Sequence, residues 1–505
     1  MAGRPWIGTK TYRTVRTIHK WAGLAACVWL FVLAVTGVLL DHHEWRWLSQ
    51  VSVPESWTSE RINRLVPGTV MRHIAVDAAD PNRLLGASER GMWLSEDRGA
   101  TWTDVAFEGL SGAPMVHRFV GTEDGRLEGL FVATDDGIWR TTTGGSKLAR
   151  LALKGKDVTG LSQGHGPGEL VGVIAQGSLV RVAVETGTVT PVDARARVAG
   201  LSATVPAYRF VMDLHFGRGT LPGSWSIWIN DLGGVAMAVL AVTGLAYWWT
   251  TRRSRRRALK LKFRRRLMRW LYRFHAPVLG LAGAIPILYL SVTAIPMNHI
   301  FEFIPWARGT DLARSRLPPV YRLTSFGHEI RGVAAWPGEP ERLSLSTRFG
   351  VIESRDGGAS WAVDRSVPVP PGTGGANLFR VGDRVFAAFG GGRNFWRRAG
   401  EEGWSKIDGP SRALTSAAVA GETWYVKNSR SIFSGPLEAG APALDDTEIP
   451  FKHAAPGTTF FLFVADIHTG LIFFPGFGWV NDVFAALAIF LVVTGPIAWA
   501  RTRWM

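Results

Sequence analysis

Histidines are the residues of this sequence whose type and spacing point most directly to chemistry. Eight of the 12 lie beside long apolar segments or in short motifs that flank them: His19, His42, His43, His215, His275, His299, His453 and His468. Six of these form three duplicated pairs, His19/His275, His43/His299 and His215/His468, whereas His42 and His453 have no counterpart. Facing helices can supply two axial imidazoles to a haem iron, and neutral imidazole also binds other metals. The pairs therefore predict haem or metal ligation.

The spacing within each half places these histidines at different depths. His43 follows His19 by 24 residues, and His299 follows His275 by 24. A helix rising ~1.5 Å per residue covers about 36 Å over that length, so the two histidines of each half lie at opposite faces of a bilayer. Interfacial histidines that snorkel beside tryptophans are one alternative. Copper or zinc is another, although no carboxylate or thiolate adjoins His19 or His275 to complete such a site.

Four apolar segments are long enough to carry these histidines across a membrane: Trp21–Leu40, Ile227–Thr250, Ala276–Met297 and Asn481–Ala500. Each approaches the ~20 residues that span a hydrocarbon core, and tryptophans mark their ends. VTGVLLDHH offers no small-x-small cleavage site, which argues against a cleaved signal peptide. The one cysteine, Cys27, excludes CxxCH haem attachment and cysteine-ligated iron–sulfur clusters.

The net charge of +16 is concentrated beside the apolar segments. Residues 252–273 hold 12 Lys or Arg, residues 1–20 hold 5, and the tail after Ala500 holds 2, all without an acidic residue. Such clusters are a positive-inside signal and not a nucleic-acid footprint. They predict both termini and the central loop in the cytoplasm, and the two long segments outside.

The chain is an internal duplication. DLHFGRGTLPG (213–223) matches DIHTGLIFFPG (466–476), WIND (228–231) matches WVND (479–482), AVTG (241–244) matches VVTG (492–495), and SEDRGATW (95–102) matches SRDGGASW (354–361). Both copies run span, external segment, span, so a pseudo-twofold axis along the membrane normal is expected. Asn230–Asp231 and Asn481–Asp482 open the second and fourth spans, which favours N-capping; a place beside a haem propionate or a proton path is the alternative.

The external segments are rich in turn residues and short alternating runs, which predicts β structure. The octapeptides resemble the Asp-box of β-propeller proteins, a structural hairpin motif, through Ser95, Asp97, Gly99 and Trp102, and Ser354, Asp356, Gly358 and Trp361. Three blade-like units per copy begin near Arg72, Gly129 and Gly168, and near Arg331, Leu378 and Ala413. Three blades cannot close a ring, so we expect one six-bladed propeller shared by both copies, or two packed half-propellers.

The membrane motifs resemble the PepSY-associated transmembrane helix family. IHKWAGL…VTGVLL, FHAPVLGLAG, DLHFGRGTLPG…VTGLAYWW and DIHTGLIFFPG…VTGPIAW match its H-x-W-x-G and LHxG…TG-x-x-x-W signatures. The resemblance implies an inner-membrane reductase of ferric siderophores that holds b-type haem with histidines, and it carries over to His19, His275, His215 and His468. Asp-box units stand where a PepSY domain is expected. Small residues on the spans (Gly23, Ala25, Ala26, Gly280, Ala282, Gly283 and Ala284) leave room for a porphyrin or serve close helix packing.

The expected architecture is a four-span α-helical bundle, built as two tandem hairpins, with an extracytoplasmic all-β domain. The predicted segments are a cytoplasmic N-terminus (1–20), spans at 21–43, 225–250, 275–299 and 471–500, external β segments at 44–224 and 300–470, a basic loop (251–274) and a cytoplasmic tail (501–505).

The predicted function is di-haem electron transfer, of an oxidoreductase type, across a bacterial inner membrane. His19 pairs with His275 near the cytoplasm, and His215 pairs with His468 near the outside, with His43 and His299 as the alternative outer pair. A cytoplasmic or quinol donor and an external ferric chelate are the expected partners, because no flavin or nicotinamide fingerprint is present. The alternative is a non-catalytic membrane protein whose β domain binds a partner or ligand and whose histidines are structural or metal-sensing.

Overall fold

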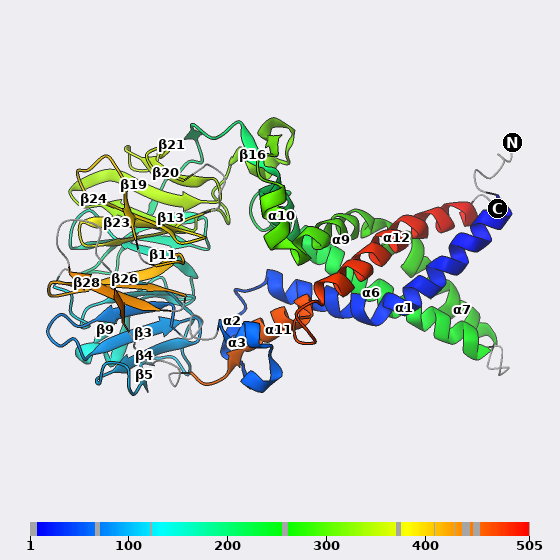
Figure 1. The fold of residues 1–505 in the computed structure, drawn as a ribbon, viewed down its shortest axis with the longest axis horizontal. Coiled ribbons are helices and arrows are strands. Elements are labelled where there is room, and N and C mark those ends of the chain that lie inside the picture. The colour runs from blue at the N-terminus through cyan, green and yellow to red at the C-terminus, as the bar shows by residue number, and fades with distance from the viewer. Residues whose placement is uncertain are drawn as a thin grey trace.

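The computed structural model describes residues 8–65, 71–121, 124–254, 261–369, 375–408, 410–429, 431–436, 445–447 and 455–503. His453 and part of the predicted basic loop, residues 255–260, lie outside these ranges. The described chain has a helical bundle at one end and β sheets at the other (Figure 1). Both termini lie at the end of the bundle farthest from the sheets.

Three helices are long and apolar enough to cross a membrane: α1 (Thr9–Asp41), α6 (Trp225–Ser254) and α12 (Gly478–Arg503). A bent pair adds a fourth span if its two parts cross together: Arg266–Ala282 and Ala284–Asn298 meet at 63°. This pair comprises α7 (Leu261–Arg273), the π-helical turn η3 (Phe274–Leu279), α8 (Gly280–Ala282) and α9 (Ala284–Asn298). The described residues thus contain three to four spans.

The third span expected from the sequence at 275–299 is therefore bent. Pro286 lies in the first turn after the bend, where its ring disfavours an unbroken helix and its nitrogen donates no hydrogen bond. Gly283 stands at the bend itself and packs against α6, where an added Cβ would lie 2.6 Å from the Cβ of Ala236. The close approach of the two helices thus coincides with the bend.

The π-helical turn also shifts the register between the copies. A π-helical turn accommodates one residue more than the α-helical turn it replaces. His19 aligns with His275, but beyond the turn Thr36 aligns with Thr293 and His42 aligns with His299. The sequence pairing of His43 with His299 is therefore displaced by one residue, and His42 has a counterpart after all.

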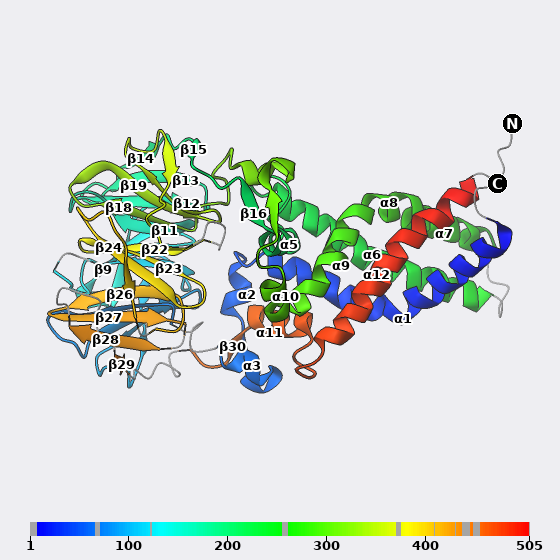
Figure 2. The ribbon, with the colours of Figure 1, turned by 45° about the horizontal axis from the view of Figure 1, so that its top comes forward.

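Short helices connect the bundle to the sheets. Two of them carry the outer histidines, α5 (Ala207–His215) and α11 (Phe460–Thr469). In Figure 2 these two helices lie between the sheets and the long helices. The others are α2 (Arg46–Gln50), η1 (Glu55–Trp57), α3 (Glu60–Asn63), α10 (Ile300–Trp306), η4 (Arg314–Arg316) and η5 (Pro319–Arg322).

Six sheets of four or five strands make up the β region in the part of the chain that the structure describes. The first copy contributes sheet 1, with β2 (His73–Val76), β3 (Leu84–Ser88), β4 (Gly91–Ser95) and β5 (Thr103–Asp104); sheet 2, with β7 (Val116–Val120), β8 (Phe131–Thr134), β9 (Gly137–Thr142), β10 (Lys147–Ala152) and β6 (Ala106–Phe107); and sheet 3, with β11 (Val158–Gln163), β12 (Glu169–Ile174), β13 (Ser178–Ala183) and β14 (Val189–Val192).

The second copy contributes the other three sheets. They are sheet 4, with β18 (Gly332–Trp336), β19 (Glu339–Thr347), β20 (Gly350–Ser354), β21 (Trp361–Val363) and β15 (Val198–Ala199); sheet 5, with β22 (Asn377–Val381), β23 (Arg384–Phe389), β24 (Arg393–Arg398) and β25 (Ser405–Ile407); and sheet 6, with β26 (Leu414–Ala420), β27 (Thr423–Asn428), β28 (Ile432–Pro436) and β29 (Asp445–Thr447). Leaving aside the edge strand β6, sheets 2, 3, 5 and 6 begin at Val116, Val158, Asn377 and Leu414. The sequence therefore placed the starts of sheets 2 and 3 more than one strand-length too late.

The first strands of the six sheets contact one another in cyclic order. β2 contacts β7 and β26, β11 contacts β7 and β18, and β22 contacts β18 and β26. Apolar side chains fill the layers between neighbouring sheets, including Trp139 and Leu85 between sheets 1 and 2. Arg118 of sheet 2 reaches the second copy, where it donates to the Thr415 carbonyl of sheet 6 (2.9 Å) and to the Asn377 side chain of sheet 5.

Strands from one copy complete sheets of the other. β15 of the first copy pairs in parallel with β21 of the second, at the outer edge of sheet 4. Nearer the bundle, β1 (Ser52–Val53) pairs with β30 (Thr458–Thr459), and β16 (Thr204–Pro206) pairs with β17 (Asp311–Ala313), both antiparallel. Both copies are thus tied into one β region.

Candidate functional site

Four histidines of the bundle make the same contact. Each imidazole Nδ1 lies within hydrogen-bonding distance of a threonine hydroxyl on a neighbouring helix. The pairs are His19–Thr494 (2.8 Å), His275–Thr243 (2.9 Å), His215–Thr293 (3.2 Å) and His468–Thr36 (2.8 Å). These are the four histidines predicted to bind haem. Three of the threonines belong to the TG dipeptides that recur along the sequence, and Thr293 is followed by alanine.

The threonine hydroxyls fix which imidazole nitrogen carries the proton. Each hydroxyl donates to the carbonyl four residues earlier in its own helix, at 2.7–2.8 Å. The oxygen is then left to accept, so the imidazole Nδ1 must be the donor. In the described part of the chain each threonine contact runs through the imidazole Nδ1, and His215 and His468 also hydrogen-bond the backbone of Leu290 and Leu33. With Nδ1 held by the threonine, Nε2 is the nitrogen that remains to ligate a metal.

The glycine that follows the threonine makes room for the ring. An added Cβ at Gly37 would lie 3.5 Å from Cε1 of His468, at Gly495 3.6 Å from Cε1 of His19, and at Gly244 3.2 Å from Cε1 of His275. The last distance is tighter than ordinary van der Waals contact, so that imidazole packs directly on bare backbone. The TG dipeptide thus supplies both a hydrogen-bond acceptor and a flat surface for the histidine.

The histidines are neighbours in the two pairs expected from the sequence. His19 acts electrostatically on His275, and His468 acts on His215. Burial, and then the nearby His468, lowers the pKa of His215 to about 3, while burial lowers that of His468 to about 4. Both outer imidazoles are therefore neutral at physiological pH, which is the form that ligates a metal.

Asparagines anchor the helices that carry the outer histidines. Asn230 Nδ2 donates to the carbonyls of Leu214 (3.3 Å) and His215 (3.1 Å) at the end of α5. Asn481 Nδ2 donates likewise to the carbonyls of His468 and Thr469, both at 3.2 Å, at the end of α11. The same amide thus holds the last turn of each histidine helix, where helix carbonyls otherwise lack a partner.

The expectation that Asn230–Asp231 and Asn481–Asp482 are N-caps is wrong. α6 begins at Trp225 and α12 at Gly478, so both dipeptides lie inside their helices. Their aspartates instead bind histidines at the outer end of the bundle: Asp231 lies 3.0 Å from Nε2 of His42, and Asp482 lies 2.6 Å from Nε2 of His299. The π-helical turn makes His42 and His299 equivalent, and their partners Asp231 and Asp482 are equivalent as well.

These aspartate contacts bear on the alternative outer pair. The Nε2 of His299 already faces a carboxylate, whereas His43 lies 3.8 Å from Glu44 through its Nδ1. The two histidines therefore have unlike surroundings, whereas each histidine of the threonine-bound set has its Nδ1 held in the same way. This arrangement favours His215 and His468 as the outer pair.

Aspartates two residues before the outer histidines connect their helices to the segments that lie between the bundle and the sheets. Asp213 accepts from Arg209 (2.9 Å) and the Tyr321 hydroxyl (2.9 Å), and lies 3.4 Å from Arg348. Asp466 accepts from the backbone N–H (2.6 Å) and hydroxyl (2.7 Å) of Ser59. Sequence analysis missed this role, although the repeated D-x-H motif was its signal.

The small residues of the spans pack helices together. Ala26 is fully buried in a cluster with Leu30 and Ala488, and Gly283 lies against Ala236 as described above. An added Cβ at Gly23 would lie 3.7 Å from Leu491. At these positions the structure favours close packing of helices over space for a porphyrin.

The Asp-box residues hold a turn in each copy. In the first copy the Ser95 hydroxyl accepts from the Gly99 N–H (2.7 Å), and Asp97 accepts from the Thr101 N–H (2.8 Å). In the second copy Ser354 accepts from the Gly358 N–H (2.8 Å), and Asp356 accepts from the Ser360 N–H (2.9 Å). Trp361 packs in the core between sheets 3 and 4, and Trp102 packs against the cluster of sheets 1 and 6.

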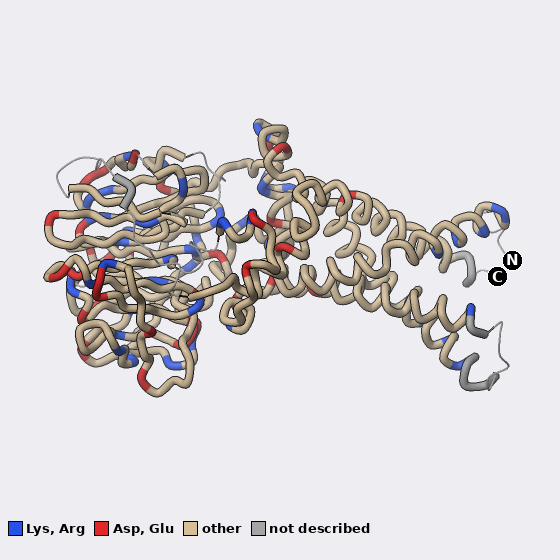
Figure 3. The backbone as a smooth tube through the Cα atoms, turned by 60° about the horizontal axis from the view of Figure 1, so that its bottom comes forward, with Lys and Arg blue, Asp and Glu red and all other residues tan. Residues whose placement is uncertain are grey.

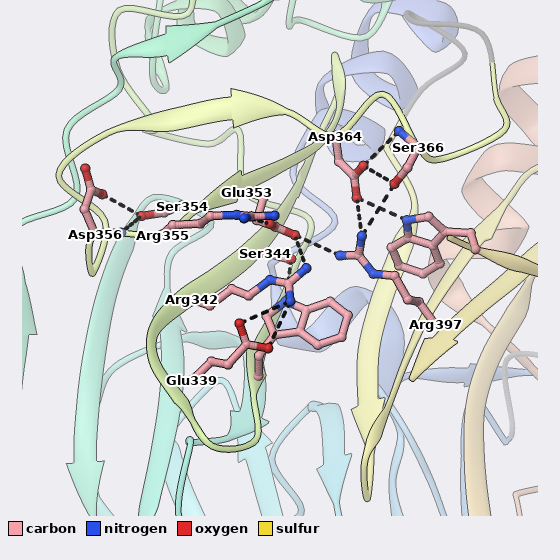
Figure 4. Close-up of polar contacts among 12 residues, drawn as sticks. Glu339, Arg342, Ser344, Glu353, Ser354, Arg355, Asp356, Asp364, Ser366 and Arg397 are labelled. Atoms are coloured by element: carbon pink, nitrogen blue, oxygen red, sulfur yellow. Dashed lines mark hydrogen bonds and ion pairs between the residues drawn. The ribbon is translucent and has the colours of Figure 1, made fainter. Parts of the chain in front are cut away.

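A second polar cluster lies between sheets 4 and 5, beside a cavity of about 1170 Å³. Figure 4 shows its central contacts. One Glu353 oxygen accepts from both Arg342 (3.0 Å) and Arg397 (2.8 Å), and both guanidinium groups stack on the Trp336 ring at 4.2 and 4.4 Å. Asp364 lies 3.2 Å from Arg397. Arg197 and Arg365 line the same cavity, as do Glu401 and Glu402.

The fold and the duplicated histidine sites define a class of membrane protein with three to four spans and a large β region outside the bundle. A family model for the PepSY-associated TM region matches residues 16–502. The chain therefore belongs to that family. A search of curated proteins found no match.

Similar solved structures resemble the chain only weakly. An ancestral GH74 enzyme has 11% identity and a TM-score of 0.34 over 74% of this chain, which spans 37% of the length of that enzyme. The computationally designed Ika8 protein has 9% identity and a TM-score of 0.30, covering 77% of this chain and 76% of its own. YCF48 from Cyanidioschyzon merolae has 11% identity and a TM-score of 0.29, covering 72% and 93%.

Proposed function

We propose that this protein is a bacterial inner-membrane electron-transfer protein that holds two b-type haems and reduces an external ferric, siderophore-type complex. His19 and His275 would bind the haem near the cytoplasm, and His215 and His468 the haem near the outer face. The observation that carries the proposal is the fourfold histidine–threonine contact, which holds Nδ1 and leaves Nε2 available in two neighbouring pairs.

Iron held by two imidazoles supplies one-electron, outer-sphere transfer and has no open position for oxygen chemistry. The residues of the chain set up that role. The threonine oxygens accept hydrogen bonds from the Nδ1–H groups, which makes the imidazoles more basic ligands and fixes their orientation. Asn230 and Asn481 hold the outer histidine helices, and Asp213 and Asp466 attach those helices to the extracytoplasmic region.

The charge distribution supports the proposed orientation. Figure 3 shows Lys and Arg at the end of the bundle near both termini, a middle almost without charge, and charges of both signs where the bundle meets the β region. Under the positive-inside rule the termini lie in the cytoplasm and the β region lies in the periplasm. The bent pair is then the fourth span. The cyclic contacts of the six sheets support a single six-bladed propeller, in place of two half-propellers.

Electrons would enter from a cytoplasmic or quinol donor and leave to a ferric complex held between the β region and the bundle. Each one-electron transfer converts one Fe(III) to Fe(II). Chelators built from hard oxygen donors bind Fe(II) less tightly, so the reduction releases the metal.

Haem content and ligand substitution test the proposal. We expect purified protein to show a Soret band and reducible α and β bands of b-type haem. His19→Ala should remove about half of the haem, whereas the matched variant His42→Ala, whose imidazole faces Asp231 and Glu44, should retain it. Colourless wild-type protein, or haem loss in His42→Ala with none in His19→Ala, would contradict the proposal.

The cavity between sheets 4 and 5 favours a second candidate function, in which the β region binds a small ligand and the protein is not a reductase. The observation for it is a change between the copies. Leu85, Leu94, Val105 and Phe107 form an apolar core in sheets 1 and 2, and the Asp-box alignment places Ser344, Glu353, Asp364 and Ser366 at the equivalent positions. Colourless protein that is stabilised by small charged molecules, and loses this response in Arg365→Ala, would favour this candidate.

A further inference from the structure

The junction between the bundle and the β region holds an excess of positive charge close to the outer histidines. Arg218 follows His215 by three residues, and Arg331 immediately precedes β18. The two arginines act electrostatically on each other, and both act on His43 and His328. Burial, and then the nearby Arg218, lowers the pKa of Arg331 to about 9. Positive charge is thus held here at a cost in hydration.

Most carboxylates around these arginines are engaged with other partners, and the exception, Asp41, hydrogen-bonds the Asn230 side chain and also acts electrostatically on Arg218. Glu329 pairs with Arg348 through Nε at 2.7 Å, and Asp213 pairs with Arg209. Glu89 pairs with Arg72, and Glu44 lies 2.6 Å from His42. Arg331 donates to the Gln176 side-chain oxygen (2.6 Å) and to the His328 carbonyl (3.4 Å). Within the described residues, the Arg218 side chain has no hydrogen bond or ion pair, and Arg331 has no ion pair with a carboxylate.

Comparison of the two copies shows that this charge excess belongs to one side. The Asp-box register aligns Arg72 with Arg331, and the backbone N–H of each donates to a backbone carbonyl of the neighbouring strand, that of Ala87 in β3 or Ser346 in β19. Arg72 is neutralised by Glu89, but the residue equivalent to Glu89 is Arg348. Arg331 has therefore lost the carboxylate that its counterpart retains.

The same asymmetry occurs beside the outer histidines. HFGRG in the first copy aligns with HTGLI in the second, so Arg218 corresponds to Leu471. Two hydrogen bonds of the Arg218 backbone hold the loop that presents this side chain. The Arg218 N–H donates to the Asp213 carbonyl (2.7 Å), and the Arg218 carbonyl accepts from the Arg348 side chain. Gly217 adopts a φ of 63° at this turn, which favours glycine. The arginine is thus fixed at the end of the helix that carries His215.

We propose that the electron acceptor is an anionic ferric chelate that docks between the bundle and the β region on Arg218 and Arg331. This inference rests on the proposed function for its iron chemistry, but the anion site itself is a property of these two arginines. Guanidinium groups without a carboxylate partner suit the carboxylate or other anionic oxygens of a chelate. Their place beside His215 brings the bound iron to the outer end of the electron path.

Binding of a redox-inert analogue tests the site without using electron transfer. The probe is Ga(III)–citrate, titrated calorimetrically into the full-length protein in detergent. We expect Arg218→Gln and Arg331→Gln each to weaken binding about tenfold, the loss typical of one charge-assisted hydrogen bond. Arg64→Gln, at an exposed arginine that pairs with Glu60 on α3, is the matched control and should bind as the wild type does. Wild-type protein that does not bind the probe, or variants that bind it unchanged, would overturn the inference.

Reoxidation kinetics separate this inference from the proposed function. Haem-loaded, dithionite-reduced protein is mixed with ferric citrate, an anion, or with hexaamminecobalt(III), a cation. The two arginine variants should retain the haem spectrum and react about tenfold more slowly with ferric citrate only. Equal slowing with both oxidants would show damage to electron transfer and would count against an anion site. Colourless protein that still binds Ga(III)–citrate through these arginines would refute the redox function and leave the anion site standing.

Discussion

The two copies of the duplicated unit agree in the bundle and differ in the β region. In the bundle, both copies bring a histidine Nδ1 to a threonine hydroxyl and an asparagine amide to the end of the outer histidine helix. In the β region, Leu94 of the first copy lies in an apolar core, while the equivalent Glu353 joins two buried arginines. A contact that is kept in both copies indicates a site built from residues of both copies. A contact that is changed in one copy indicates a role of that copy alone.

We expect the largest effects from variants that exchange side chains between the apolar core of sheets 1 and 2 and the ionic cluster between sheets 4 and 5. Leu94→Glu places a carboxylate in the apolar core of sheets 1 and 2. Glu353→Leu removes the acceptor that Arg342 and Arg397 share and leaves them Glu339 and Asp364. Breaking a buried ion pair costs about 3–5 kcal/mol; the remaining partners place Glu353→Leu at the lower end of that range, which for a domain of this size lowers the melting temperature by roughly 10 °C. Thermal unfolding of the β region, followed by circular dichroism, measures both.

Glu353→Gln serves as the control for this exchange because it keeps one acceptor for the two guanidinium groups. It should cost less than Glu353→Leu. Equal stability of wild type and Glu353→Leu would mean that the ionic cluster contributes nothing to the fold of the second copy.

The next effect concerns the threonines of the outer pair. Thr36→Val with Thr293→Val removes the acceptors of the two Nδ1 protons while keeping the side-chain shape. Loss of such a partner weakens metal binding about 10–100-fold, so the outer haem should dissociate more readily. The outer haem that stays bound should have a higher reduction potential because less basic imidazoles stabilise its Fe(III) less. Spectroelectrochemical titration measures both changes.

Thr14→Val is the matched control for these variants. Thr14 also donates to the carbonyl four residues earlier, at 3.2 Å, but it is exposed and faces none of the four histidines. An identical shift in potential in this variant would show that the effect comes from helix perturbation and not from the imidazoles.

The smallest effect concerns the Asp-box turns, which are alike in both copies. The Ser360 hydroxyl and N–H lower the pKa of Asp356 from its ordinary value of 3.8 to about 2. A carboxylate with a lowered pKa stabilises the fold above pH 3.8, and that contribution is lost as the pH falls toward 2. Asp356→Asn should therefore lower the melting temperature slightly at pH 7 and flatten its fall between pH 4 and 2. An unchanged acid profile would contradict this.

Sequence patterns were sufficient for the parts of the structure that repeat. The family membership, the apolar helices and the β region followed from hydropathy, turn residues and the duplicated motifs. The TG dipeptides were visible as a repeat, but their contact with the histidines was not, because it joins different helices that lie between 32 and 475 residues apart in the sequence. The π-helical turn at His275 was equally hidden, since an inserted residue changes spacing by only one, and it misaligned His43 with His299. The D-x-H aspartates were overlooked because their partners, such as Tyr321 and Ser59, lie outside every motif.

Haem stoichiometry tests the central claim most directly. The claim is that the duplicated histidine–threonine contacts form two bis-imidazole sites in each chain. A pyridine haemochrome assay on purified protein, scaled to protein concentration, should give two haems b per chain, and the His215→Ala/His468→Ala double variant should give one. Protein without haem, or a double variant that still carries two, would contradict the claim.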